Sequence, residues 1–193
     1  FVGSRGLGDV YKRQLLFNET SGSLNKEWLN SLAEDVKYLR ENDKEVIIVS
    51  SGAIAMGAKD LDLDMKNMKM DMNQAVSAVG QIHLMGSFKS AFEKNEIKIS
   101  QILLTLDDTE QRRRSINARR TIDTLLKLGI VPVVNENDTI ATSEIRYGDN
   151  DRLASRVAQI TSADCLILLS NINGLYSADP STDEDVKLIN KVS

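Results

Sequence analysis

The chain has 193 residues, of which 41% are hydrophobic and 27% charged, a balance typical of a globular domain and not of a disordered chain. Its 24 basic and 28 acidic residues give a net charge of −4, which argues against nucleic acid as a partner. No apolar run approaches the roughly 20 residues that a membrane span needs. The single cysteine, Cys165, excludes an intramolecular disulfide and favours a reducing compartment, so we expect a cytoplasmic protein without a membrane partner.

The first elements expected along the chain are a helix and a buried strand. Residues 1–14 show neither helical nor strand periodicity, so we expect no element there. Asn25 is a candidate N-cap for a helix whose apolar residues recur at helical spacing over 28–39. The run EVIIV at 45–49 predicts a strand buried on both faces, and it leads directly into Ser50-Ser51-Gly52-Ala53.

The rest of the chain alternates helical and strand patterns. In chain order these are a helix at about 73–94, a strand at 97–105, a helix at about 111–128, a strand at 129–135, a helix at about 150–161 and a strand at 165–170. Apolar strands separated by helices indicate parallel pairing with right-handed crossovers. The sequence therefore predicts an α/β fold, a three-layer αβα sandwich with a mostly parallel central sheet.

A segment rich in methionine, aspartate and lysine separates the first strand from the next long helix. Residues 58–72 contain four methionines between Met65 and Met72. They fit a surface loop. They also fit a substrate lid or regulatory contact, because methionine side chains adapt to ligands.

The loops after the predicted strands at 45–50, 129–135 and 165–170 should share one edge of the sheet, where parallel sheets bind ligands. Two polar segments at this edge stand out. The turn Ser50-Ser51-Gly52-Ala53 fits either an anion cradle at a helix N-terminus or an ordinary capped turn. The second segment runs from Asn135 to Asp151 and has more Asn, Asp and Glu than a connector needs. Such side chains can hold an α-ammonium and an α-carboxylate, or orient lysines and a magnesium–nucleotide complex. The alternative is a solvated Ω-loop.

Other conspicuous residues carry weaker signals. Five arginines at 112–120 fit a solvated helix face or a subunit contact better than a nucleic-acid site, because no aromatic residues are interleaved with them. His83 has no partner at metal-ligand spacing, so we expect no metal site there. Cys165 opens an apolar strand and is interpreted as a packing residue.

Several stretches of the chain, taken together, resemble the glutamate 5-kinase branch of the amino-acid kinase family. They are VSSGAIAMG (49–57), AVSAVGQIHLM (75–85), ILLTLDD (102–108), RRRSINARRTIDTLL (112–126), VPVVNENDTIATSEIRYGDNDRLAS (131–155) and ADCLILLSNINGLYSADP (163–180). The resemblance covers residues 15–193, and the NENDTIAT…GDND pairing is its specific part.

The resemblance implies ATP-dependent phosphorylation of the side-chain carboxylate of L-glutamate, the first step of proline biosynthesis. It implies ATP and Mg²⁺ as cofactors, proline as a feedback inhibitor and a homo-oligomer. It assigns glutamate binding to Ser51, Gly52, Ala53, Asn135, Asp138, Asp149 and Asn150. It assigns Asp151 to organising the catalytic lysines, and Ser170 and Asn171 to binding ATP.

The resemblance also implies departures from the family pattern. A phosphate-binding lysine is expected near positions 10 or 11, where this chain has Val10 and Tyr11. We therefore interpret residues 1–14 as a non-native segment and 15–193 as a partial, incomplete kinase domain, a hypothesis that the genomic reading frame tests. The chain stops at Ser193, before the family's glycine-rich nucleotide loop and second catalytic lysine. Asn171 replaces an aspartate.

Because lysines stabilise the transferring phosphoryl group, we expect little or no kinase activity from this exact polypeptide. Two alternatives stay open. One is the kinase half of a bifunctional pyrroline-5-carboxylate synthase, which a following dehydrogenase domain would support. The other is a non-catalytic amino-acid-binding module, which glutamate binding without ATP hydrolysis would support.

Overall fold

A parallel sheet forms the centre of the computed structural model, which describes residues 2–4, 25–65, 68–141, 149–169, 177 and 187. Its strands are β1 (Val2–Ser4), β2 (Ile48–Val49), β3 (Ile99–Leu104), β4 (Val131–Glu136) and β5 (Ile167–Leu169). They lie in the order β3-β4-β2-β1-β5, and every pairing within the described residues is parallel. The expected parallel α/β sheet is therefore confirmed.

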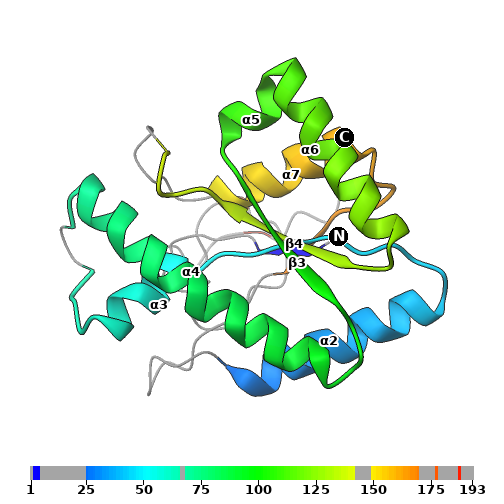
Figure 1. Cartoon of the computed structure of the whole chain (residues 1–193), viewed down its shortest axis with the longest axis horizontal. Coiled ribbons are helices and arrows are strands. Elements are labelled where there is room, and N and C mark those ends of the chain that lie inside the picture. The colour runs from blue at the N-terminus through cyan, green and yellow to red at the C-terminus, as the bar shows by residue number, and fades with distance from the viewer. Residues whose placement is uncertain are drawn as a thin grey trace.

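Helices cover both faces of this sheet (Figure 1). They are α2 (Lys26–Glu41), α3 (Ala53–Asp60), α4 (Met70–Glu93), α5 (Leu106–Glu110), α6 (Arg112–Lys127) and α7 (Asp149–Thr161). One apolar core joins α2, α3 and α4 to the sheet, and a second joins α6 and α7 to the opposite face. The structure thus has the three layers that the sequence predicts.

Alternation along the central strands assigns their side chains to the two cores. Val46 and Ile48 pack with α2 and α4, whereas Ile47 and Val49 pack with α6 and α7. Successive side chains of a strand point to opposite faces, so an unbroken apolar run satisfies both layers at once. All six residues of β4 are buried, as expected for a strand between two helical layers.

The helix after Asn25 begins as the sequence predicts. The Asn25 side chain accepts a hydrogen bond from the backbone N–H of Trp28 at 3.1 Å, which satisfies one of the N–H groups left open in the first turn. At the other end of α2, Arg40 donates to the carbonyl of Gly129 at 2.7 Å. This contact joins α2 to the turn that precedes β4.

Two sequence expectations are wrong in detail, and one helix is absent from them. Residues 2–4 form β1, which pairs with both β2 and β5, although no element was expected within 1–14. The short helix α5 was not expected, yet Thr105 caps it with a reciprocal bond to Asp108. Cys165 is exposed and precedes β5, so it is not a buried packing residue. Whether residues 1–14 are native stays a prediction.

Helices α3 and α4 approach each other unusually closely. A Cβ atom placed on Gly57 would lie 1.9 Å from the carbonyl oxygen of Val76, and one on Gly80 would lie 1.7 Å from that of Ala53. Both positions therefore exclude any side chain, because backbone atoms cannot move aside cheaply. The two glycines fix α3 and α4 as one unit.

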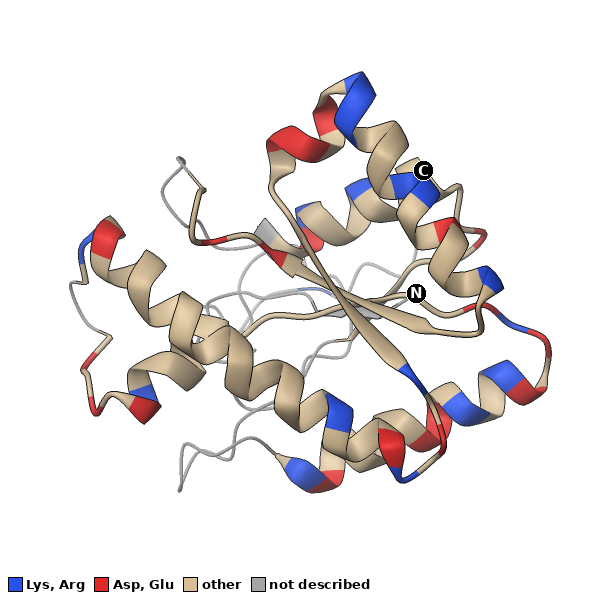
Figure 2. Ribbon diagram, in the orientation of Figure 1, with Lys and Arg blue, Asp and Glu red and all other residues tan. Residues whose placement is uncertain are grey.

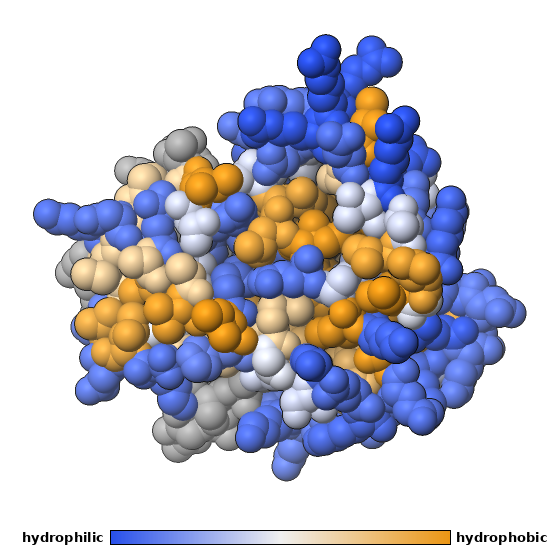
Figure 3. Space-filling model, in the orientation of Figure 1, coloured by the Kyte–Doolittle hydropathy of each residue, from blue (hydrophilic) through white to orange (hydrophobic). Residues whose placement is uncertain are grey.

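Charged residues lie mainly on the helices and loops around the sheet, as Figure 2 shows. On the face viewed in Figure 3, apolar residues gather near β3, between α4 and α6. β3 is paired on one side only within the described sheet, and most of its residues are half-buried. Among the described helices, none is long and apolar enough to cross a membrane.

Candidate functional site

The carboxyl ends of β2 and β4 bring the two polar segments together. Val49 pairs with Val134, and the backbone N–H of Ser50 donates to the carbonyl of Val134 at 2.8 Å. Ser51 and Asn135 therefore leave adjacent strands at the same edge of the sheet. This confirms the expected shared edge for two of the three loops. The loop after β5 lies outside the described residues.

The turn between β2 and α3 depends on a left-handed glycine. Gly52 has φ 103° and ψ 5° and is the N-cap of α3, whose first residue is Ala53. Gly52 has no side chain with which to cap this helix, and its carbonyl accepts from the N–H of Met56. Ser51 is buried beside the turn. The backbone N–H groups of the first turn of α3 are thus left without a side-chain cap near Ser51.

Asn135 is buried at the end of β4 with part of its hydrogen-bonding capacity unused. Its side chain is 3% exposed, and its Oδ1 accepts from the backbone N–H of Glu136 at 2.9 Å. Its Nδ2 has no hydrogen-bond partner among the described residues. A buried amide donor without a partner is costly, so this atom fits a ligand acceptor.

The segment after β4 carries a buried carboxylate. Asp138 is 8% exposed, and one of its oxygens, Oδ2, accepts from the hydroxyl of Ser77 at 2.6 Å. Two further residues of α4 contact the same segment: Gln74 Nε2 donates to the carbonyl of Ala141 and Gln81 Nε2 to that of Glu136. Ser77 and Gln81 lie in the stretch AVSAVGQ, but nothing in the sequence pattern distinguishes them as site residues.

The first turn of α7 contains the three remaining predicted substrate and catalytic residues. Asp149 begins the helix, and its side chain lies outside the described residues. Asn150 Oδ1 is buried and has no hydrogen-bond partner among the described residues. Asp151 is half-buried, and its carbonyl accepts from the hydroxyl of Ser155. Acidic side chains in a first turn suit the positive end of the helix dipole.

The two predicted ATP-binding residues, Ser170 and Asn171, lie outside the described residues, as does the position of the expected N-terminal lysine. Within the described ranges no group of three or more His, Cys, Asp or Glu side chains is placed to hold a metal ion. The described part of the candidate site therefore consists of a helix N-terminus, buried amides and a buried carboxylate.

A turn capped by a side chain follows β3. Burial would raise the pKa of the Asp108 carboxyl, but hydrogen bonds from the backbone N–H and hydroxyl of Thr105, together with the Arg114 guanidinium at 2.9 Å, hold it below its ordinary value. Asp108 is therefore charged near neutral pH, and it accepts bonds that fix the start of α5.

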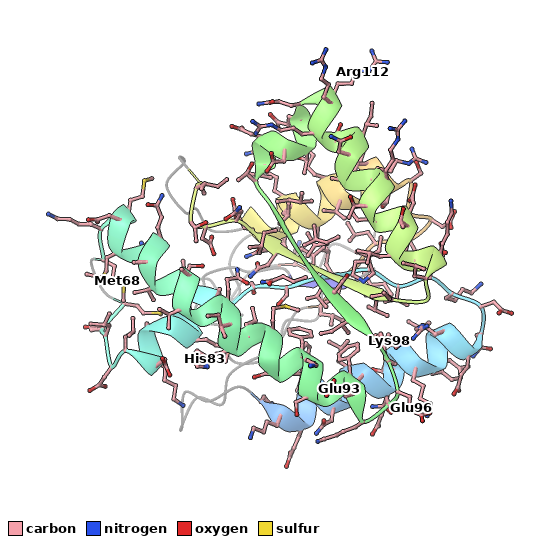
Figure 4. The ribbon with its side chains drawn as sticks, in the orientation of Figure 1. Met68, His83, Glu93, Glu96, Lys98 and Arg112 are labelled. Atoms are coloured by element: carbon pink, nitrogen blue, oxygen red, sulfur yellow. The ribbon has the colours of Figure 1, made fainter. Side chains whose placement is uncertain are left out.

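The arginine cluster and His83 lie on the surface. Figure 4 shows Arg112 pointing away from the molecule, while Arg114 and Arg119 pair with acidic neighbours on α5 and α6. The five arginines thus lie on an exposed helix face, which fits both the solvated face and the subunit contact that the sequence favours. His83 lies on α4, with Nε2 at 3.3 Å from a carboxylate oxygen of Asp60 on α3.

The chain is similar in sequence to proteins of a known family. The model of the amino acid kinase family matches residues 17–193. A glutamate 5-kinase from Pelagibacter ubique is 61% identical over 167 residues, which cover 86% of this chain and 45% of that protein. One from Rhodospirillum rubrum is 52% identical over 179 residues, covering 93% of this chain and 48% of the relative. The chain thus spans about half the length of these relatives.

Solved structures share the fold at low identity. A product complex of the isopentenyl phosphate kinase of T. acidophilum has a TM-score of 0.59 at 15% identity, covering 90% of this chain and 73% of that one. A substrate complex of an isopentenyl phosphate kinase has a TM-score of 0.60 at 16% identity, covering 91% and 75%. At such identities the likeness concerns the fold alone.

Proposed function

The chain belongs to the amino acid kinase family, and we propose that the protein made from its complete reading frame phosphorylates L-glutamate with ATP. The names and identities of the relatives, 61% and 52%, support glutamate 5-kinase activity. The structural observation that carries the proposal is Asn135, which is buried beside the Ser51 turn and whose Nδ2 has no hydrogen-bond partner among the described residues. A small ligand rich in carboxylate oxygens would satisfy that donor.

Different residues of the candidate site would bind the carboxylate groups and the ammonium group of an amino acid. The Asn135 amide and the N–H groups at the start of α3 would bind carboxylate oxygens, since both are donors. Asp138 would bind the α-ammonium, because a buried carboxylate favours a cation. Gly52 and Ala53 shape the approach to the helix start, and Asp149 and Asn150 would complete the site from the first turn of α7.

The chemistry requires little acid–base catalysis. The glutamate side chain is already ionised at neutral pH, so one of its oxygens attacks the γ-phosphorus directly. A carboxylate–phosphorus bond forms as the bond from the γ-phosphorus to the β–γ bridging oxygen breaks, and ADP leaves with the electron pair. The protein must bring two anions together and disperse the charge that moves.

The nucleotide side of the site is proposed from the family likeness. ATP would contact Ser170 and Asn171, and Asp151 would orient the lysines that face the transferring group. Mg²⁺ enters as the ion that accompanies the ATP phosphates and neutralises part of their charge. Inhibition by proline, self-association and a cytoplasmic location remain predictions, checked by proline titration, sedimentation and cell fractionation.

The test of the function is capture of the acyl phosphate. The complete protein with L-glutamate, MgATP and hydroxylamine should yield glutamyl hydroxamate and ADP in equal amounts. Replacing Asn135 by Ala should raise the KM for glutamate about ten-fold or more, because a hydrogen-bond donor to a charged group is lost. The control, Asn117→Ala on the exposed side of α6, should leave it unchanged. Absence of hydroxamate from the wild-type protein would refute the proposal.

A further inference from the structure

Ser77 on α4 donates a short hydrogen bond across the fold to the Asp138 carboxylate. The two residues are 61 positions apart, Ser77 is 0% exposed, and the distance from its Oγ to Asp138 Oδ2 is 2.6 Å. A short hydrogen bond in a water-poor site is electrostatically stronger than one in water. The Ser77 hydroxyl therefore restrains the position of one carboxylate oxygen.

This choice of partner is unusual for a serine inside a helix. Helical serine hydroxyls commonly bond to a carbonyl of the preceding turn. Ser87 on the same helix does so with the carbonyl of His83, and Ser155 on α7 does so with that of Asp151. Ser77 differs because its hydroxyl reaches outside its own helix, to the segment that follows β4.

Neighbouring residues on the same face of α4 hold the ends of that segment. Gln74 and Gln81 lie three residues before and four residues after Ser77, which places all three on one helical face. Gln74 bonds to the carbonyl of Ala141 at 3.0 Å, whereas Gln81 lies 3.4 Å from the carbonyl of Glu136. The three side chains thus contact the segment at Ala141, Asp138 and Glu136, over its whole length.

Helix α4, which supplies these contacts, is packed closely against α3, whose first turn forms the other part of the candidate site. Gly80, one turn beyond Ser77, packs against the carbonyl of Ala53, the first residue of α3. α3 starts at the Gly52 turn, so one rigid pair of helices places both that turn and the segment around Asp138. A site supported in this way keeps its geometry without a ligand.

We infer that Ser77 is a positioning residue for amino-acid recognition, acting through Asp138. The inference rests on the proposed function, in which Asp138 binds the substrate ammonium. The hydroxyl orients the carboxylate toward a cation and satisfies one of its oxygens in a buried place. Loss of the hydroxyl should weaken binding of the amino acid and leave binding of ATP unchanged.

The test compares two replacements of Ser77, isosteric with each other, in the complete protein. Ser77→Thr keeps the hydroxyl. Ser77→Val has the same shape as the Thr variant but lacks the hydroxyl, so any effect of the added methyl group on packing is common to both variants. The KM for glutamate should be about ten-fold or more higher in the Val variant than in the Thr variant. The KM for ATP should agree within about two-fold. The control, Ser87→Ala, should match the wild type in both constants.

A double-mutant cycle adds a readout that a purely structural role would not move. In an Asp138→Asn background, exchanging Val for Thr at position 77 should change the KM for glutamate by less than about two-fold, because the charged partner is gone. Equal KM values for the Thr and Val variants, or equal changes for glutamate and ATP, would overturn the inference. Wild-type protein that phosphorylates no glutamate would instead overturn the proposed function.

Discussion

Gly52 shows how a single backbone conformation sets the start of the site. Its φ of 103° lies in a region that side chains disfavour, and the turn it makes aims the N-terminus of α3 at the sheet edge. Ser51 and Asn135, which lie next to this turn, are buried polar residues, and the turn determines how they are placed relative to the start of α3. The site is therefore sensitive to changes that alter no charge.

Replacing Gly52 by Ala should lower the free energy of unfolding by about 1–2 kcal/mol, because a Cβ strains this left-handed turn. Gly52→Asn should lose less, since asparagine tolerates positive φ better than alanine. Urea unfolding of the three proteins gives the order. An Ala variant as stable as the wild type would contradict the strain.

Asp108 should make stability depend on pH. The folded-state pKa of its carboxyl lies below the ordinary value of 3.8, so its contribution is present above about pH 4 and is lost as pH falls through the folded value. Asp108→Asn should lower the free energy of unfolding by about 1 kcal/mol at pH 7 and by less at pH 3.

Urea unfolding of Asp108→Asn and the wild type at both pH values measures this difference. The exposed neighbour Asp107, changed to Asn, serves as the control and should cost less at pH 7, because its side chain is not part of the reciprocal cap. An Asp108→Asn effect that grows as pH falls would contradict the sign of the pKa shift.

At the scale of elements, the pairing of α3 with α4 supports the site most directly. Their two glycines allow backbone contact, and the polar face of α4 holds the segment after β4. A change at this crossing should therefore affect stability and substrate binding together, even though neither glycine is a site residue.

Gly80→Ala should lower the free energy of unfolding by about 2 kcal/mol or more, because its Cβ would meet the Ala53 carbonyl. The matched control is Gly86→Ala on the same helix, where nothing lies within 4 Å of the added atom. That change should be neutral or should stabilise by up to about 1 kcal/mol, as alanine favours helices. Thermal unfolding compares the two, and equal effects would contradict the close approach.

At the scale of the whole molecule, the sheet is built from distant parts of the chain. β1 lies between β2 and β5, although 43 residues separate Ser4 from Ile48. An interior strand pairs with two neighbours, so its loss leaves two unpaired strand edges. The segment at residues 2–4 therefore matters more than its length suggests.

Deleting residues 1–4 should lower the free energy of unfolding by about 3 kcal/mol or more, at roughly 1 kcal/mol for each ladder hydrogen bond lost. The register from Val2↔Ile167 to Ser4↔Leu169, together with Val2↔Ile48, defines the pairs that disappear. Urea midpoints measure the loss. An unchanged midpoint would show that this segment adds nothing to the sheet.

Local patterns determined most of the elements and the edge of the sheet where the site lies. Apolar runs such as 45–49 require burial on two faces, and helical periodicity after Asn25 requires one apolar face, so both are readable without tertiary contacts. The T-x-x-D signature at Thr105 could also have predicted α5. Asn135 ends one predicted strand and Ser51 follows another, which is why their common edge could be predicted.

Only the tertiary structure decided which residues meet across the fold. Strand β1 is too short for a periodic pattern, and it forms because β2 and β5 pair with it. Ser77 resembles any helical serine in sequence, and its bond to Asp138 exists because two segments 61 residues apart are packed together. Periodicity reports one element at a time, whereas such contacts depend on how the elements are placed against each other.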